Sequence, residues 1–406
     1  MLIFAACVAI FVYGMVSSML GTINPGLANK FHLDNIQTGY LALAQGLGFV
    51  IASVSGGALM DKKGNKVGLL LGLGLESASL FLLANAPGYT AIIVAMVGMG
   101  IGAGIILTGA NALGSAVSES KRAAVLNFLN VFVGLGGLAT PFVAGNLLSG
   151  DAVRVAYAGA IITSATFVLH VLTKMPTPVR AVSGSRSAGS SGVFRRPVLY
   201  VLALIIFLYT ACEFGIWNWL VKYLISRGIQ ESSALNILSL GFALGLLLGR
   251  VAIAPVLMKI PPLNVVLGAA ALMAITTYSV LLVSDTKMAA IAVFCAGLAM
   301  APVFPTTLAV LANIFQQGTA TAIGFTITCG FTGLTVSSPI IGWLSGTDPK
   351  GLGVGLMVLP IVSIVIVGIT LILLRSKLVL EGSGSEFGPV VSPSVRPERL
   401  AGDGSS

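Results

Sequence analysis

The residues with the clearest chemical potential lie in one apolar stretch, Tyr209 to Trp219, which holds a carboxyl group, an amide and two indoles. Glu213 stands near the middle of the surrounding apolar run, and Trp217 and Asn218 follow within five residues. A helix here would place the carboxyl group near the centre of a bilayer, where a charge costs at least about 2.5 kcal/mol and is rarely kept without a role. The stretch therefore predicts binding of a polar solute or a cation in a water-filled cavity.

The composition predicts a polytopic membrane protein. Apolar residues make up 56% of the 406 residues and charged residues only 9%, whereas soluble domains carry about 25% charged residues. The net charge of +9 does not indicate nucleic-acid binding, because the basic residues stand in short loops between apolar runs. We expect no metal site and no disulfide, because the four cysteines lie inside apolar runs with no CxxC spacing.

The apolar runs predict twelve transmembrane helices, since a span needs about 20 apolar residues. The first run is too long for a signal-peptide core and has no basic residues before it, so we expect it to be a span. The predicted spans cover residues 2–24, 37–60, 66–86, 89–116, 122–148, 152–173, 197–225, 233–257, 263–283, 287–313, 319–345 and 352–374.

The long connection after the sixth span divides the chain in two. Residues 175–196 are rich in Ser, Gly and Arg and predict a flexible linker. We expect an N-terminal six-helix bundle at 1–174, a C-terminal six-helix bundle at 197–375, and a disordered tail at 376–406 that has no apolar periodicity.

The distribution of Lys and Arg predicts the orientation. With the N-terminus in the cytoplasm, sixteen Lys and Arg fall in cytoplasmic segments and six in outer segments, which is a clear positive-inside bias. Both termini are therefore expected in the cytoplasm, with a bacterial inner membrane as the expected location.

The loop after the second span carries a recognisable pattern, Gly57-x-x-x-Asp61-Lys62-x-Gly64-x-Lys66. Gly57 would permit close helix packing, and Asp61 could pair with a base or cap the next helix. Gly64 would allow a tight turn, and the lysines would hold the loop on the cytoplasmic side. The pattern resembles the loop signature of the major facilitator superfamily, which implies an all-α fold of two six-helix bundles.

Three further segments resemble the fucose–glucose/galactose branch of that superfamily, which contains sugar:proton symporters and similar sodium-linked glucose transporters. They are residues 126–136 in span 5, residues 213–224 in span 7 and residues 300–309 in span 10. One departure concerns the coupling ion. Proton-coupled members carry an acidic residue in span 1, and residues 1–29 contain none.

Glu76 and Glu213 are the two acidic residues predicted at membrane depth. The resemblance implies that spans 1, 4, 7 and 10 line the cavity and that span 3 is peripheral, which favours Glu213 as the coupling acid and leaves Glu76 as a second candidate with a structural alternative. We expect no Lys or Arg at mid-depth to pair with either acid, so either could be uncharged at rest and exchange protons.

A neutral, hydroxyl-rich solute fits the absence of a mid-depth base, because sites for anions usually keep an Arg or Lys. Arg250 is expected near the inner face, as part of a conformational gate with the loop pattern. Amides and a carboxylate suit hydroxyl groups and an indole suits the apolar face of a sugar, although each amide could instead join two helices. The predicted substrate-binding residues are Gln45, Asn111, Asn127, Asn130, Glu213, Trp217, Asn218 and Thr306.

The sequence thus predicts a secondary transporter that moves a neutral monosaccharide across the membrane by alternating access, coupled to H+ or Na+ and needing no other cofactor. The alternatives are an uncoupled sugar facilitator, an exporter of drugs or other small organic solutes with the same fold, and a non-transporting sensor. No nucleophile–base pair or phosphate-binding loop indicates an enzyme. The expected surroundings are the lipid bilayer, and the expected state is a monomer.

Overall fold

Every regular element in the described part of the chain is a helix. The computed structural model describes residues 2–117, 122–175, 190–316 and 318–376. The elements are α1 (Leu2–Phe31), α2 (Asn35–Lys63), α3 (Asn65–Ala84), α4 (Tyr89–Val117), α5 (Arg122–Asn146), α6 (Ala152–Leu172), α7 (Ser190–Val193), α8 (Pro197–Ser226), α9 (Glu231–Asn236), η1 (Ile237–Ala243), α10 (Leu244–Leu257), α11 (Pro262–Leu282), α12 (Thr286–Met300), α13 (Val303–Ile314), α14 (Thr319–Ser345), η2 (Pro349–Gly351), α15 (Leu352–Leu356) and α16 (Val358–Arg375).

The helices are long enough to span a bilayer. Within the described residues, eleven helical segments are long and apolar enough to cross a membrane. The further helix α2, of 29 residues, occupies the expected second span. The predicted all-α membrane fold is confirmed.

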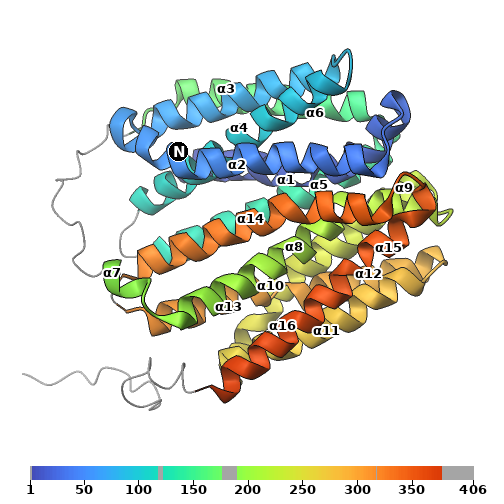
Figure 1. Cartoon of the computed structure of the whole chain (residues 1–406). Coiled ribbons are helices and arrows are strands. Elements are labelled where there is room, and N and C mark those ends of the chain that lie inside the picture. The colour runs from blue at the N-terminus through green and yellow to red at the C-terminus, as the bar shows by residue number, and fades with distance from the viewer. Residues whose placement is uncertain (1, 118–121, 176–189, 317, 377–406) are drawn as a thin grey trace, which may run out of the picture.

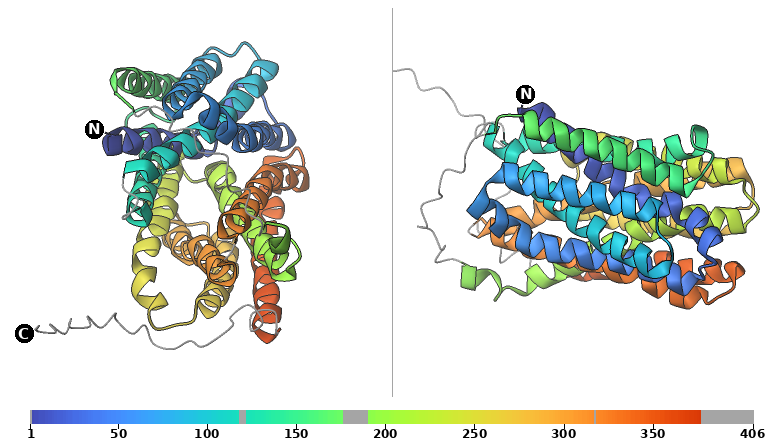
Figure 2. Two further views of the ribbon diagram at one scale, coloured as in Figure 1. Left: turned by 90° about the vertical axis from the view of Figure 1, so that its left-hand side faces the viewer. Right: turned by 90° about the horizontal axis from the view of Figure 1, so that it is seen from above.

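The helices gather in two groups, visible in Figure 1 as a blue-to-green set above and a green-to-red set below. In the first group α2 and α3 pack against α4, and α1 packs against α5; in the second α14 packs against α8, and α11 packs against α12 and α16. Figure 2 shows the same two groups from the end. The predicted linker at 175–196 and tail at 376–406 lie largely outside the described residues.

Proline interrupts one membrane-spanning helix and is tolerated within another. The predicted tenth span is divided at Pro302, because α12 ends at Met300 and α13 begins at Val303. The predicted end of span 1 at residue 24 is wrong, since α1 continues through Pro25 to Phe31. Neighbouring helices can satisfy the carbonyl that a proline leaves unpaired, so a helix at membrane depth tolerates proline.

The eighth span contains a π-helical segment that the sequence pattern does not predict. It comprises η1, Ile237–Ala243, between α9 and α10. A π-helix has wider turns than an α-helix and is frequent near functional sites. Because of these wider turns, α-helical spacing counted from α9 through η1 does not correctly predict which side chains of α10 share a face with those of α9.

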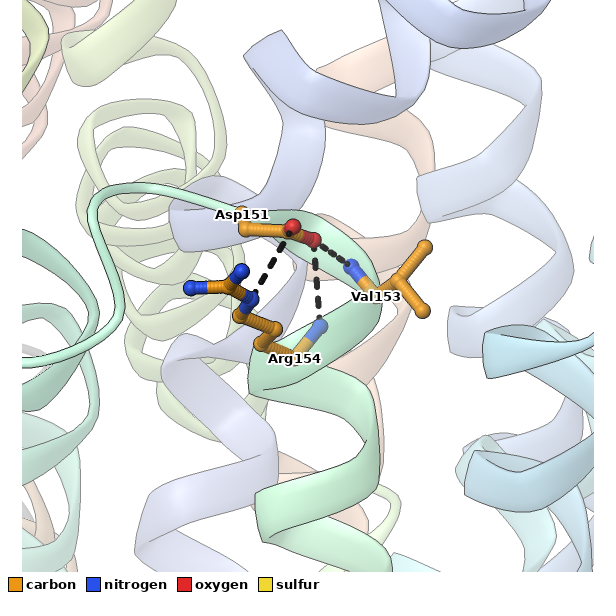
Figure 3. Close-up of polar contacts among 3 residues, drawn as sticks. All are labelled: Asp151, Val153 and Arg154. Atoms are coloured by element: carbon orange, nitrogen blue, oxygen red, sulfur yellow. Dashed lines mark hydrogen bonds and ion pairs between the residues drawn. The ribbon is translucent and has the colours of Figure 1, made fainter.

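A side-chain cap starts α6 (Figure 3). The carboxylate of Asp151 accepts hydrogen bonds from the backbone N–H groups of Val153 and Arg154, at 2.9 and 3.1 Å. Its second oxygen lies 3.5 Å from the Arg154 guanidinium. An N-cap of this kind satisfies backbone donors that the helix itself leaves unpaired, which fixes where the sixth span begins.

The two groups of helices meet closely at one end, where α1 ends at Phe31 and α2 begins at Asn35; we call it the closed end. The backbone of α1 at Gly21 contacts the carbonyl of Trp217 in α8, and Gly39 of α2 lies against Ser338 and Pro339 of α14. Glycine leaves room for such backbone contact, which a side chain would prevent.

Hydrogen bonds join the two groups at the closed end. The Asn24 amide donates to the carbonyl of Asn218 at 3.0 Å, and the Lys222 ammonium donates to the hydroxyl of Thr38 at 3.1 Å. The side chains of Asn146 and Asn236 pair with each other across α5 and α9. These polar contacts fix the position of one group of helices relative to the other at this end.

The opposite end of α2 and α14 contains two glycines in open positions. A side-chain carbon added at Gly57 of α2 or at Gly324 of α14 would meet no atom of the described residues within 4 Å. Close helix packing at Gly57, which the sequence predicts, is not seen among the described residues in this conformation.

We predict that Gly21→Ala opens the closed end. The added methyl group meets the Trp217 carbonyl, and overpacking costs about 1–3 kcal/mol. We therefore expect roughly tenfold slower disulfide formation between Asn146→Cys and Asn236→Cys in a background without the four native cysteines. Gly324→Ala is the matched control, because it adds the same group in open space. Equal cross-linking rates for the two alanine variants would contradict the closed-end packing.

Candidate functional site

The central feature of the site is an ion pair between α8 and α10. Glu213 lies near the middle of the 30-residue helix α8 and is 8% exposed. Its Oε1 atom lies 3.8 Å from the Nη2 atom of Arg250. The expectation that no basic residue reaches the mid-depth acid is wrong, and so is the assignment of Arg250 to the inner face alone.

The geometry explains how Arg250 reaches this depth. It lies seven residues before the end of α10 at Leu257, which is about 10 Å along a helix axis at 1.5 Å per residue. The side chain of Arg250 remains 32% exposed and that of Glu213 11% exposed. The guanidinium thus bridges from a more open region to the buried carboxylate, and the pair avoids two separate uncompensated charges.

Two tyrosines flank the pair. Tyr209 precedes Glu213 by one helical turn and is fully buried, with its hydroxyl beside both members of the pair. Tyr13 comes from α1, in the other group of helices. Both tyrosines are close enough to interact electrostatically with Glu213 and with Arg250. The ion pair therefore faces the boundary between the two groups.

A small cavity lies beside the pair, between α1, α2 and α4 on one side and α8 and α14 on the other. It encloses about 30 Å³, enough for roughly two water molecules and too little for a hexose without further opening. Its polar lining comes from Ser17, Gln45 and Asn218, and its aromatic lining from Tyr13, Phe49 and Phe214. Of the predicted binding residues, Gln45 and Asn218 are thus brought together.

Asn218 also ties the cavity to the closed end. Its side-chain amide donates to the hydroxyl of Ser338 in α14 at 2.9 Å, and its backbone carbonyl accepts the hydrogen bond from Asn24. Motion of α8 relative to α1 must therefore disturb the residue that lines the cavity.

Trp217 does not line this cavity in the described conformation. Its ring packs edge-on against Phe242 of η1, with 5.2 Å between ring centroids, and lies against Gly137 of α5. The aromatic surface expected from the indoles is supplied instead by Tyr13, Phe49 and Phe214.

Three of the other predicted binding residues, Asn111, Asn130 and Thr306, do not line this cavity. Asn111 in α4 is partly buried, and Asn130 in α5 is exposed. Thr306 in α13 is buried, and its hydroxyl has no partner among the described residues. The side chain of Asn127 lies outside what the structure describes.

Glu76, the second candidate coupling acid, belongs to a different environment. It is fully buried, and its carboxyl group lies beside Gly102, where α3 packs on α4. Neither carboxyl oxygen has a hydrogen-bond partner in the described part of the chain. The structure therefore separates Glu76 from the ion pair at the boundary between the groups.

The connection between α2 and α3, where the loop pattern lies, is a single residue. α2 continues to Lys63, and α3 begins at Asn65. Gly64 between them has a φ of 91°, a conformation that favours glycine, so the predicted tight turn is confirmed. Lys62 is exposed, and the side chain of Asp61 lies outside what the structure describes.

Sequence reasoning missed Tyr209, Tyr13 and Phe49. Helical spacing could have indicated Tyr209, because residues four apart share a face and it precedes Glu213 by four. No local signal identifies Tyr13 and Phe49, which depend on how α1 and α2 meet α8.

A model described as Major Facilitator Superfamily matches residues 6–337 of the chain. The chain therefore belongs to the Major Facilitator Superfamily, whose members are transporters and not enzymes.

Curated relatives are distant. The Glucose/mannose transporter GlcP of Bacillus subtilis is 22% identical over 384 residues, covering 90% of this chain and 93% of its own length. Bypass of stop codon protein 6 of Saccharomyces cerevisiae is 23% identical over 60% of this chain, and Multidrug resistance protein 1 of Bacillus subtilis is 23% identical over 46%. The chain spans about half the length of these last two, 55% and 49%.

Solved structures share the fold. The nucleoside transporter NupG has a TM-score of 0.74 at 12% identity, covering 93% of this chain and 98% of its own. The transporter FucP, in its outward conformation, has a TM-score of 0.61 at 18% identity, covering 91% and 98%. These structural similarities support the fold and do not identify the transported solute.

We predict that Glu213 and Arg250 are energetically coupled. Glu213→Leu or Arg250→Met leaves one charge without its partner. Removing one partner of a fully buried pair lowers the free energy of unfolding by about 3–5 kcal/mol. We expect a smaller loss of stability here, because Arg250 is partly exposed. We expect each single variant to lower the apparent melting temperature in detergent and the double variant to recover most of that loss. Additive losses in the double variant would show that the two side chains do not interact.

Proposed function

We propose that this secondary transporter moves a neutral monosaccharide, hexose-like in size, by alternating access coupled to a cation, H+ or Na+. The observation that carries the proposal is the charge-balanced Glu213–Arg250 pair beside a cavity lined by Gln45 and Asn218. The names of two relatives agree with a sugar: the Glucose/mannose transporter GlcP and the L-fucose-proton symporter.

The charge balance supports a neutral solute. One carboxylate and one guanidinium cancel at the site, so neither an anion nor a cation gains net Coulomb attraction from the pair. The same two groups supply hydrogen-bond acceptors and donors, which sugar hydroxyls need. The rings of Tyr13, Phe49 and Phe214 would cover the apolar face of a pyranose. Their arrangement requires the cavity to widen when the solute enters.

The transport cycle follows from the asymmetry between the two ends. If the Lys- and Arg-rich segments face the cytoplasm, both termini do so too, and the closed end faces outward. The described conformation is then open toward the inside, in the bacterial inner membrane. Residues 1–174 and 197–375 would rock as two bundles about the central site, in a protein that works as a monomer.

The loop after α2 would act in the other state. We assign Gly57, Asp61, Lys62 and Gly64 to a gate that closes the inner face when the closed end opens. The open space at Gly57 supports this assignment, because a partner helix could approach there after the bundles rock. Arg250 would belong to the same gate.

A small organic carboxylate is the second candidate solute. Arg250 makes a single contact of 3.8 Å with Glu213 and is 32% exposed, so its other N–H groups could bind a carboxylate bidentately. The name of one relative, a 3-(3-hydroxy-phenyl)propionate transporter, agrees with this class of solute.

The test of coupling is uptake of labelled hexoses into proteoliposomes under imposed H+ or Na+ gradients. We expect the wild type to concentrate a hexose with one gradient only. We expect Glu213→Gln to lose accumulation and keep exchange, because exchange needs binding but no net cation movement. Glu76→Gln is the matched comparison, and it should still accumulate. Loss of accumulation in Glu76→Gln alone would move the coupling role to Glu76, and no hexose uptake under any gradient would contradict the sugar assignment.

The cavity residues give a further prediction for the same assay. Gln45→Ala should raise the KM for the transported hexose about five- to tenfold, the equivalent of one lost hydrogen bond of roughly 1–1.4 kcal/mol. Asn264→Ala removes an exposed amide from α11 and should leave the KM unchanged. An unchanged KM in Gln45→Ala would remove this residue from the binding site.

A further inference from the structure

The cavity beside the ion pair has a polar layer and an aromatic layer. On α1, α2 and α8 the lining residues farthest from the closed end are aromatic, namely Tyr13, Phe49 and Phe214. The polar lining residues each stand four residues nearer the closed end on the same three helices, at Ser17, Gln45 and Asn218. Four residues make about one helical turn, so the aromatic layer lies between the polar layer and the opposite end of the protein.

A ring from the other group of helices extends the aromatic layer. Phe331 of α14 packs on Phe49 of α2, with 4.3 Å between the ring centroids and a tilt of 56°. Phe49 also packs on Tyr13 of α1, with 6.1 Å between the centroids. Aromatic rings attract each other at such separations. The three rings thus connect the two groups of helices, where α2 and α14 run side by side (Figure 1).

We propose that Phe49 and Phe331 form a gate, here called the ring gate, between the cavity and the end opposite the closed end. The ring gate opens by movement of a side chain, while the bundles stay together at the closed end. That a solute passes through it rests on the proposed function. Entry of a small reagent into the cavity is a property of the gate itself and is measured without any solute.

The contacts between α2 and α14 change in kind along the two helices. Nearer the closed end, a side-chain carbon added at Gly39 would lie 3.0 Å from the Cα atom of Pro339, and one added at Gly46 would lie 2.9 Å from that of Thr335. Backbones that approach so closely separate only when the helices separate. At the ring gate the contact is made by two side chains, which change rotamer faster than whole domains move.

Phe331 is the member of the ring gate with freedom to move. Phe49 is only 7% exposed, whereas Phe331 is incompletely buried. About two turns beyond the rings, the same helices carry Gly57 and Gly324 in open positions. The Phe331 ring can therefore turn away from Phe49 toward a less crowded region without any change at the closed end.

The ring gate gives the cavity a second barrier, of a different kind from the first. The closed end is held by backbone contact and by hydrogen bonds such as that from Asn24 to the carbonyl of Asn218, so it opens through movement of the bundles. The ring gate needs a change of one side chain. A solute in the polar layer would stay covered by the rings until they part, and the cavity would not be open at both ends at once.

Phe325 provides a matched comparison on the same helix. Its ring packs edge-on against Phe194 and Tyr200, with centroid distances of 5.6 and 5.7 Å. Both partners come from the second half of the chain, so this contact does not join the two groups of helices. Phe325→Ala removes the same ring as Phe331→Ala from α14 and should leave the barrier at the cavity intact.

The experiment measures how fast a small, charged methanethiosulfonate reagent reaches the cavity. The full-length protein, with its four native cysteines replaced, carries Gln45→Cys in the polar layer as the reporter. A second protein carries Gly324→Cys, which lies in the open region beyond the rings. Each reporter is combined with Phe331→Ala or Phe325→Ala, and labelling rates in detergent are followed by mass spectrometry. Disulfide formation between Asn146→Cys and Asn236→Cys is measured separately in the same two alanine backgrounds.

We expect Phe331→Ala to raise the labelling rate of Gln45→Cys about tenfold, because the ring that covers the cavity is gone. Phe325→Ala should leave this rate unchanged, and neither alanine variant should alter labelling of Gly324→Cys. Disulfide formation at the closed end should proceed at the same rate in both alanine backgrounds as without them, which separates opening of the ring gate from movement of the bundles.

Three results would overturn the inference: an unchanged labelling rate of Gln45→Cys in Phe331→Ala, the same acceleration in Phe325→Ala, or acceleration accompanied by slower disulfide formation at the closed end. If Phe331→Ala does not purify as a folded protein, Phe331→Leu replaces it and should accelerate labelling to a smaller extent. Because no solute is present, a wrong sugar assignment leaves these outcomes unaffected.

Discussion

The structure depends on keeping a carboxylate at the centre of a bilayer-spanning bundle. The surrounding helices exclude bulk water from Glu213, and a lone charge there would be costly. Arg250 removes most of that cost by pairing at 3.8 Å, yet it stays partly exposed and so remains able to move. A fully enclosed pair would be static, and a fully exposed one would have little effect.

The closed end turns this local pair into part of a moving structure. α1 and α8 touch backbone to backbone at Gly21 and Trp217, one turn beyond Glu213 along α8. Asn218 in the next position lines the cavity and is hydrogen-bonded to both α1 and α14. The helix that carries the ion pair therefore also carries the contact that shuts one end. Separation of the bundles at that end must change the surroundings of the cavity and of the pair together.

Much of the fold is predictable from the sequence because a bilayer requires long apolar segments, and the turn at Gly64 follows from local backbone chemistry. The central position of Glu213 follows from the same rule. Its partner does not, because the π-helix η1 changes the phase of the eighth span and a long side chain carries Arg250 away from its backbone position. Trp217 shows a second limit of prediction from the sequence. An indole near a polar centre suggests a binding surface, but the arrangement of the helices places the Trp217 ring against Phe242.

The most direct measurement is a structure of the protein determined with a transported hexose. We expect the sugar between α1, α2 and α8, in contact with Gln45 and Asn218, with the Glu213–Arg250 pair adjacent to it. We also expect the cavity to widen through movement of the bundles and not through unfolding of a helix. A sugar bound elsewhere, with Gln45, Asn218 and the ion pair all out of contact, would contradict the central claim.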